Sequence, residues 1–184
     1  MNKQYKKLFW GLIFISFNFT FFNINILPDF IGYILITYAL TELSKVEEAY
    51  IKGKKYSEIM ILFSIFKLFI PFPNFNFTIS TENIAILIIS NLFNIINLIL
   101  YYYICKGIYN QSEKVNNIEL KNICSFRWNL KFYLTCIALL ISAFYINLST
   151  YVELILMYVY ILITIINILI ILLVRKTMKI FNEI

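Results

Sequence analysis

Long apolar stretches alternate with short polar segments along the 184 residues of this chain. Crossing the hydrocarbon core of a bilayer as a helix takes about 20 predominantly apolar residues. The stretches that approach this length lie at roughly 8–26, 29–44, 56–70, 84–105, 130–147 and 152–174. The pattern predicts an all-α polytopic membrane protein, a bundle of six transmembrane helices that forms a single domain over residues 1–184.

Two features of the first half of the chain affect this topology. Residues 29–44 form a short stretch, which either spans the membrane fully or is re-entrant. The first stretch follows Lys3, Lys6 and Lys7, as the core of a signal peptide would, but no small-residue cleavage site comes after it. We therefore interpret the first stretch as an uncleaved transmembrane helix.

The basic residues alternate with the apolar stretches. All 16 lysines and arginines except Lys67 lie at the N-terminus, at the second and fourth connections or in the C-terminal tail. Because positive residues stay in cytoplasmic loops, this distribution predicts six spans with both termini in the cytoplasm. The same residues favour anionic lipid at the cytoplasmic face of the bilayer. Within the fourth connection, residues 112–126 form either a short helix on the inner leaflet or a solvated loop.

Composition argues against a soluble fold and against catalysis. Hydrophobic residues make up 61% of the chain and charged residues 14%, with a mean hydropathy of +0.78. Soluble domains usually have roughly 45–50% apolar and about 25% charged residues. Histidine, the usual general base and the commonest metal ligand, is absent, and the three cysteines form no CxxC pair. We therefore expect no metal site, no cofactor, no enzymatic activity and no nucleic-acid partner.

A turn with a proline, an acid and a glycine separates the first two apolar stretches. Pro28 blocks continuation of a helix, and Asp29 can cap the next helix by accepting hydrogen bonds from its first N–H groups. Gly32 has no side chain and lets another helix approach closely. Two interpretations are open: a tight outer turn with a packing contact, or an ion or substrate site at the outer end of the second helix.

At the Leu-Pro-Asp-Phe-Ile-Gly-Tyr turn of residues 27–33, the chain resembles a group of small, uncharacterised multi-pass membrane proteins from low-GC Gram-positive bacteria. The resemblance covers residues 1–45, and the remainder is similar only in hydropathy. It implies a bacterial cytoplasmic membrane as the location and transfers no activity.

Lys67 is the one basic residue expected on the outer side, near the end of the third apolar stretch. Its long side chain can extend outward to the interface. It can also pair with Asp29, which is expected at a similar depth, or with Glu82. An Asp29–Lys67 pair would join the second and third helices.

Three asparagines, Asn91, Asn94 and Asn97, lie in the fourth stretch at intervals of three. Successive steps of three in an α-helix rotate by about 300°, so these side chains share one broad side. They either line a hydrated cavity or form hydrogen bonds with neighbouring helices.

Taken together, these features favour a membrane scaffold, regulator or accessory subunit that acts through helix contacts with a membrane protein partner. The alternative is a small-molecule transporter or the substrate-binding membrane subunit of an uptake system. The two differ in the core: a transporter needs a polar-lined cavity, which we expect among the second to fourth helices, whereas a scaffold has a filled core.

Overall fold

The computed structural model describes residues 2–16, 20–21, 24–25, 29–69, 84–144 and 150–181. Within these residues the chain forms six helices: α1 (Asn2–Ser16), α2 (Asp29–Leu43), α3 (Ala49–Phe69), α4 (Ile84–Lys114), α5 (Ile118–Phe144) and α6 (Thr150–Ile180). Two short strands, β1 (Thr20–Phe21) and β2 (Ile24–Asn25), pair antiparallel between α1 and α2. The predicted all-α fold class is confirmed at this level.

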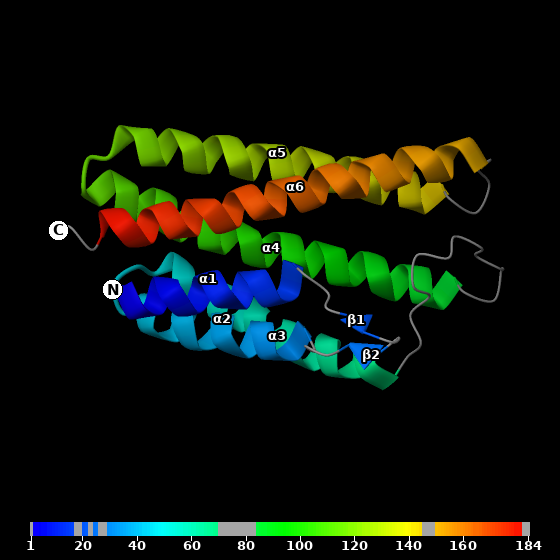
Figure 1. Ribbon diagram of the computed structural model, residues 1–184, viewed down its shortest axis with the longest axis horizontal. Coiled ribbons are helices and arrows are strands. Elements are labelled where there is room, and N and C mark those ends of the chain that lie inside the picture. Colours follow the sequence, from blue (N-terminus) through cyan, green and yellow to red (C-terminus); the bar gives the residue numbers. More distant parts are fainter. Residues whose placement is uncertain are drawn as a thin grey trace.

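The helices form a closed bundle in chain order. Each helix packs against the next, and α1 contacts α6. Figure 1 shows that the start of α1 and the end of α6 lie at one end of the bundle, together with the α2–α3 and α4–α5 turns. The ends of the helices that meet there contain nearly all described lysines and arginines. We call this the basic end.

The first helix differs from the expected range of 8–26. It begins at Asn2 and ends at Ser16, and β1 and β2 occupy positions that the sequence assigned to a continuous helix. Residues 18–25 contain three asparagines and a threonine. These side chains compete with helical backbone hydrogen bonds, and the phenylalanines and isoleucine among them favour strands. The apolar run was therefore longer than the helix.

The fourth connection is also shorter than either expected form. Helix α4 continues to Lys114 and α5 begins at Ile118, so neither a separate helix over 112–126 nor a long loop is present. Asn116 has a φ of 53°, in the left-handed region that asparagine tolerates. The Asn117 side chain accepts a hydrogen bond of 2.9 Å from the Leu120 amide, which caps α5. Two asparagines thus suffice to reverse the chain.

Two of the described helices, α4 and α6, are long enough to span a membrane. Among the described residues, the segments Leu87–Lys114 and Leu154–Ile180 are long and apolar enough to cross a bilayer. Helices α1 and α2 have 15 residues each, which corresponds to about 22 Å, less than the roughly 30 Å of a hydrocarbon core. The bundle of six spans therefore stays a prediction.

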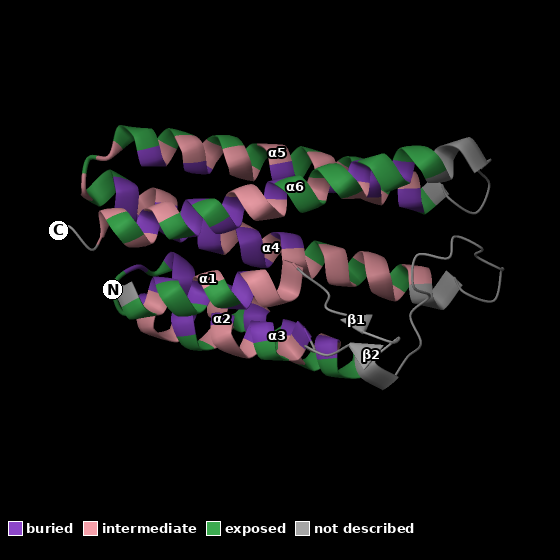
Figure 2. Ribbon diagram, in the orientation of Figure 1, coloured by how far each residue is buried: buried purple, intermediate pink, exposed green. Residues whose placement is uncertain are grey.

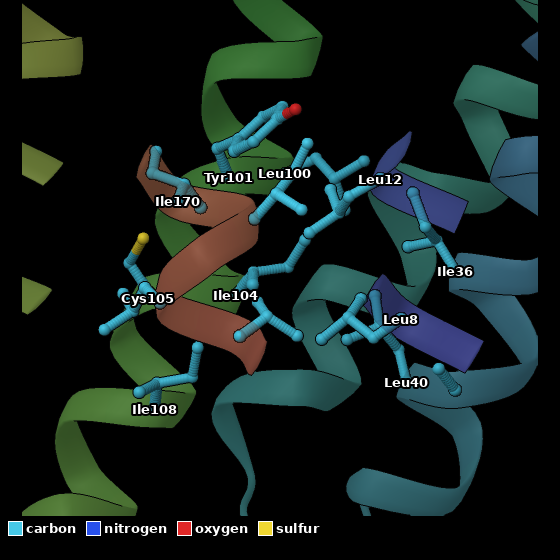
Figure 3. Packing of buried hydrophobic residues seen from close by; sticks show 14 of the residues in the cluster. Leu8, Leu12, Ile36, Leu40, Leu100, Tyr101, Ile104, Cys105, Ile108 and Ile170 are labelled. Carbon is cyan, nitrogen blue, oxygen red and sulfur yellow. The ribbon is translucent and has the colours of Figure 1, made fainter. Parts of the chain in front are cut away.

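The larger hydrophobic cluster joins all six helices, and α1, α2, α4 and α6 contribute most of its buried side chains. Figure 3 shows Leu8 and Leu12 of α1 facing Ile36 of α2 and Ile104 of α4, with Ile170 of α6 on the other side. Figure 2 shows that the buried stripes of these helices face the interior of the bundle. These side chains pack against one another in the centre of the bundle. A smaller cluster lies between α5 and α6, toward the end opposite the basic end.

The α2–α3 turn is attached to α4 by a buried carboxylate. Glu47 is 8% exposed and accepts hydrogen bonds of 2.7 Å from Asn110 Nδ2 and 2.6 Å from Lys114 Nζ. Burial opposes ionisation, but these two hydrogen bonds, the charge of Lys114 and a hydrogen bond from the Ala49 backbone outweigh it and hold the pKa of Glu47 below its ordinary value of 4.5. A carboxylate with a lowered pKa stabilises the fold above its unfolded pKa, and the contribution is lost as pH falls through the folded pKa.

We expect Glu47→Gln to lower the free energy of unfolding by about 1–2 kcal/mol at pH 7 and to reduce the loss of stability between pH 5 and pH 3, because the variant has no carboxylate to protonate. Unfolding followed by circular dichroism at several pH values measures both effects. Glu48→Gln, at an exposed neighbouring position, is the control. Equal pH dependence in Glu47→Gln and the parent protein would contradict this role.

Candidate functional site

A polar cavity of about 190 Å³ lies between α4, α5 and α6. Figure 1 shows these helices side by side over much of their length. The volume corresponds to about six water molecules at roughly 30 Å³ each. The side chains that line the cavity include Asn94, Asn97, Lys131, Thr135, Tyr160 and Asn167. A cavity with this many polar groups inside an otherwise apolar bundle is the best candidate for a functional site.

Helical periodicity explains why polar residues from distant parts of the chain meet here. On α5, Lys131, Thr135 and Ala138 follow one another at intervals of four and three, which places them on one face. On α6, Tyr160 and Asn167 are seven residues apart, which is two turns. Each helix therefore presents one stripe to the cavity, although the rest of its surface is mostly apolar.

Lys131 is the central residue of the site. Lys131 is 3% exposed, and the 13 residue-to-residue steps from Ile118 correspond to about 20 Å along α5 from the basic end. Its Nζ donates a hydrogen bond of 2.5 Å to Asn167 Oδ1 and lies 3.9 Å from the centroid of the Tyr101 ring. Among the described residues, no carboxylate forms an ion pair with it. Both contacts are to neutral groups, so no described residue supplies a counter-charge to Lys131.

A second cation lies one turn away on α5. The Arg127 guanidinium is partly buried and donates a hydrogen bond to the backbone carbonyl of Leu169 on α6. The part of the chain that the structure describes holds no carboxylate in ion-pair contact with Arg127 either. Lys131 lines the cavity and Arg127 does not, but two adjacent basic side chains without acidic partners make this part of α5 electropositive. Charge separated from water acts over a longer range than at the surface.

Two polar atoms near Lys131 have no hydrogen-bond partner among the described residues. They are Asn97 Oδ1 and Thr135 Oγ1, and both are buried. Most buried polar atoms in proteins have a partner, and leaving one without costs about 1–3 kcal/mol. The unpaired atoms therefore mark the part of the cavity where a bound molecule would gain hydrogen bonds.

The sequence left two roles open for the three asparagines of α4, which were lining a cavity and forming hydrogen bonds with neighbouring helices. The structure shows both. Asn94 and Asn97 line the cavity. The Asn91 side chain instead accepts a hydrogen bond of 3.1 Å from Ser142 Oγ and joins α4 to α5. The cavity lies among α4, α5 and α6, not among the second to fourth helices as expected.

The other sequence candidates lie away from the cavity. Asp29 is buried at the first residue of α2. Gly32 lies where α2 crosses Gly11 of α1, so closely that a Cβ on either glycine would be less than 3 Å from the other's carbonyl oxygen. The Lys67 side chain lies outside the described residues, so the Asp29–Lys67 pair stays a prediction.

Sequence reasoning missed Lys131, Thr135 and Asn167. Lys131 follows Arg127 closely and was therefore counted with the cytoplasmic basic residues. Its spacing with Arg127 and Thr135, four residues on each side, was the available signal, because it places all three on one face of a helix.

No protein-family model matches this chain, and no curated protein and no solved structure is significantly similar to it.

Proposed function

We propose that this protein is an integral membrane protein of six spans that binds a small polar solute in the cavity between α4, α5 and α6, as a transporter or the substrate-binding subunit of an uptake system does. The observation that carries the proposal is Lys131, a buried lysine without an acidic partner among the described residues, at the wall of a polar cavity. Ionisable residues inside membrane helices are costly, and they commonly mark substrate or ion pathways.

The surface of the bundle supports a membrane environment. Large apolar side chains point outward on several helices, with exposed fractions of 60% for Leu62, 65% for Phe66, 63% for Leu140 and 65% for Tyr158. Such surface is unfavourable in water and suits lipid. The basic end, which holds the start of α1 and the end of α6 (Figure 1), supports a cytoplasmic location for both termini and contact with anionic head groups in a bacterial cytoplasmic membrane.

The cavity also favours solute binding over a scaffold. A scaffold that acts only through its outer helix faces needs a filled core. The larger hydrophobic cluster packs side chains of all six helices together, but the α4–α6 side retains a cavity with buried polar atoms that lack partners among the described residues. Packing alone would have closed such a cavity with apolar side chains.

Ligand-induced stabilisation tests the proposal. We expect at least one class of small polar compound to raise the melting temperature of the purified protein in detergent, because a ligand at 100 times its Kd stabilises by about 2.7 kcal/mol. The panel contains carboxylates, phosphate, polyols and amines. Ala138 lines the cavity and is buried, so Ala138→Phe fills the site and should abolish the effect. The matched control is Ala143→Phe, on the exposed side of α5. Stabilisation that survives in Ala138→Phe, or none from any class, would refute the proposal.

Labelling with a membrane-impermeant maleimide tests the six spans. Single cysteines are placed in a variant without Cys105, Cys124 and Cys136. We expect labelling from outside the cell at positions 25, 76 and 149, and none at 3, 48 and 113, because the second group lies at the basic end or at a turn beside it. External labelling at position 48 would mean that residues 29–44 do not cross the membrane.

A further inference from the structure

The charges around the cavity indicate the sign of its ligand. Lys131 and Arg127 both lie on the face of α5 that contacts α6, and the described residues provide no acid to either of them. By contrast, each described lysine that forms an ion pair near the basic end lies in a more exposed place, such as Lys176 with Glu119. A cation or a zwitterion would bring an ammonium group toward Lys131. An anion would supply the missing counter-charge.

The hydrogen-bonding groups indicate more than charge. Lys131 uses one donor on Asn167 Oδ1 and directs its charge toward the Tyr101 ring, which leaves an N–H group for a ligand. The Thr135 hydroxyl has no partner among the described residues and can donate to the same anion. Asn97 Oδ1 is an acceptor without a partner in the described chain, so it needs a donor. The site therefore combines donors for an anionic oxygen with an acceptor for a hydroxyl group.

The volume of the cavity limits the size of the ligand. The cavity of about 190 Å³ is below the roughly 300–1,000 Å³ of pockets for drug-sized ligands. A molecule of a few carbon atoms fits within this volume, whereas a nucleotide or an oligosaccharide is larger than it. The apolar part of the lining, which includes Leu98 and Ala138, can contact such a short carbon chain.

We propose that the cavity binds a small monovalent anion that carries a hydroxyl group, with a short hydroxycarboxylate as the representative free solute. Lys131 and Thr135 bind the anionic oxygens and Asn97 accepts from the hydroxyl. This inference rests on the proposed solute-binding function and adds the chemical class of the solute.

Three matched compounds test the class on the unaltered protein. Lactate carries both groups, propionate lacks the hydroxyl, and propane-1,2-diol lacks the charge. Binding to the purified protein in neutral detergent is measured by calorimetry and by the change in melting temperature. We expect lactate to bind about fivefold more tightly than propionate, the effect of one ordinary hydrogen bond, and the diol not to bind measurably. A preference for the diol or for an amine, abolished by Ala138→Phe, would overturn the anion assignment while the solute-binding function stands. No binding by any compound would overturn both.

Two variants identify the residues. Lys131→Met should weaken lactate binding at least tenfold, because hydrogen bonds to charged groups contribute more than neutral ones. Its unliganded melting temperature should not fall, since a buried amino group without an acidic partner is removed. Asn97→Leu should make lactate and propionate bind equally. The control Lys179→Met removes the same charge from an exposed position on α6 and should leave binding unchanged. Unchanged lactate binding by Lys131→Met would overturn the proposal.

The same chemistry is present in a lipid head group, because phosphatidylglycerol has one negative charge and free hydroxyls. Micelles with and without this lipid separate the two sources. Stabilisation by phosphatidylglycerol that Ala138→Phe abolishes, together with no binding of lactate, would overturn the free solute and identify the head group as the ligand. Stabilisation by the lipid that persists in Ala138→Phe would come from lipid bound at the basic end. If lactate also binds, this result leaves the proposal in place.

Discussion

Gly32→Ala is expected to lower the free energy of unfolding by about 1–3 kcal/mol, the usual range for overpacking a tight contact. A Cβ at position 32 would lie 2.5 Å from Ile15 Cγ2 and 2.9 Å from the carbonyl oxygen of Gly11. The isoleucine side chain can rotate away. The carbonyl belongs to the backbone of α1, so it moves only if α1 and α2 separate. Separation would also disturb the large hydrophobic cluster beside it, in which Leu12 and Ile36 are fully buried.

Gly53→Ala is the matched control for this prediction. Its Cβ would lie 3.2 Å from Tyr103 Cβ and 3.4 Å from Leu40 Cδ1, which requires only a small adjustment. Both substitutions replace a helical glycine and gain roughly 0.5–1 kcal/mol of intrinsic helix stability, so the difference between them isolates the α1–α2 contact. Unfolding in mixed micelles, followed by circular dichroism, measures the difference. Equal stability of the two variants would show that α1 and α2 do not require the close approach.

Gly107→Ala is expected to have a similarly large effect for a different reason. A Cβ at position 107 would lie 2.3 Å from Tyr50 Cζ and 2.4 Å from Tyr50 Cε1. The ring has little freedom to move, since Tyr50 is fully buried and its hydroxyl lies 3.0 Å from that of Tyr5. Tyr5 in turn donates a hydrogen bond to Gln111 on α4. Moving the ring breaks a buried network, so we expect a loss of about 2–4 kcal/mol from overpacking and lost hydrogen bonds combined.

A double-mutant cycle separates the clash from a general effect on α4. Tyr50→Leu removes the ring that the alanine would meet, so the combination with Gly107→Ala should cost less than the sum of the two single substitutions. The coupling should be absent between Tyr50→Leu and Gly53→Ala. Strict additivity of Tyr50→Leu and Gly107→Ala would contradict a direct contact between the two positions.

The sequence predicted the helices better than it predicted their ends. Apolar runs are a local signal, and six of them became six helices in the expected order. The ends depend on turn chemistry, which acts over two or three residues. The asparagines at 116 and 117 reverse the chain between α4 and α5, where the hydropathy pattern indicated a connection of more than twenty residues. The same kind of signal, polar residues within an apolar run, ended α1 at Ser16 before the expected boundary.

The sequence by itself determined the helical class, the collection of basic residues at alternate connections and the presence of asparagines on α4. Only the tertiary structure decided which of these residues form a site. Asn91 and Asn94 are one turn apart on the same helix, yet one contacts Ser142 and the other lines the cavity. Lys131 became the central residue because α4 and α6 cover it and bring Asn167 and Tyr101 to its ammonium group. The physical reason is that burial and pairing depend on the rotation of three helices about their axes, which no single segment contains.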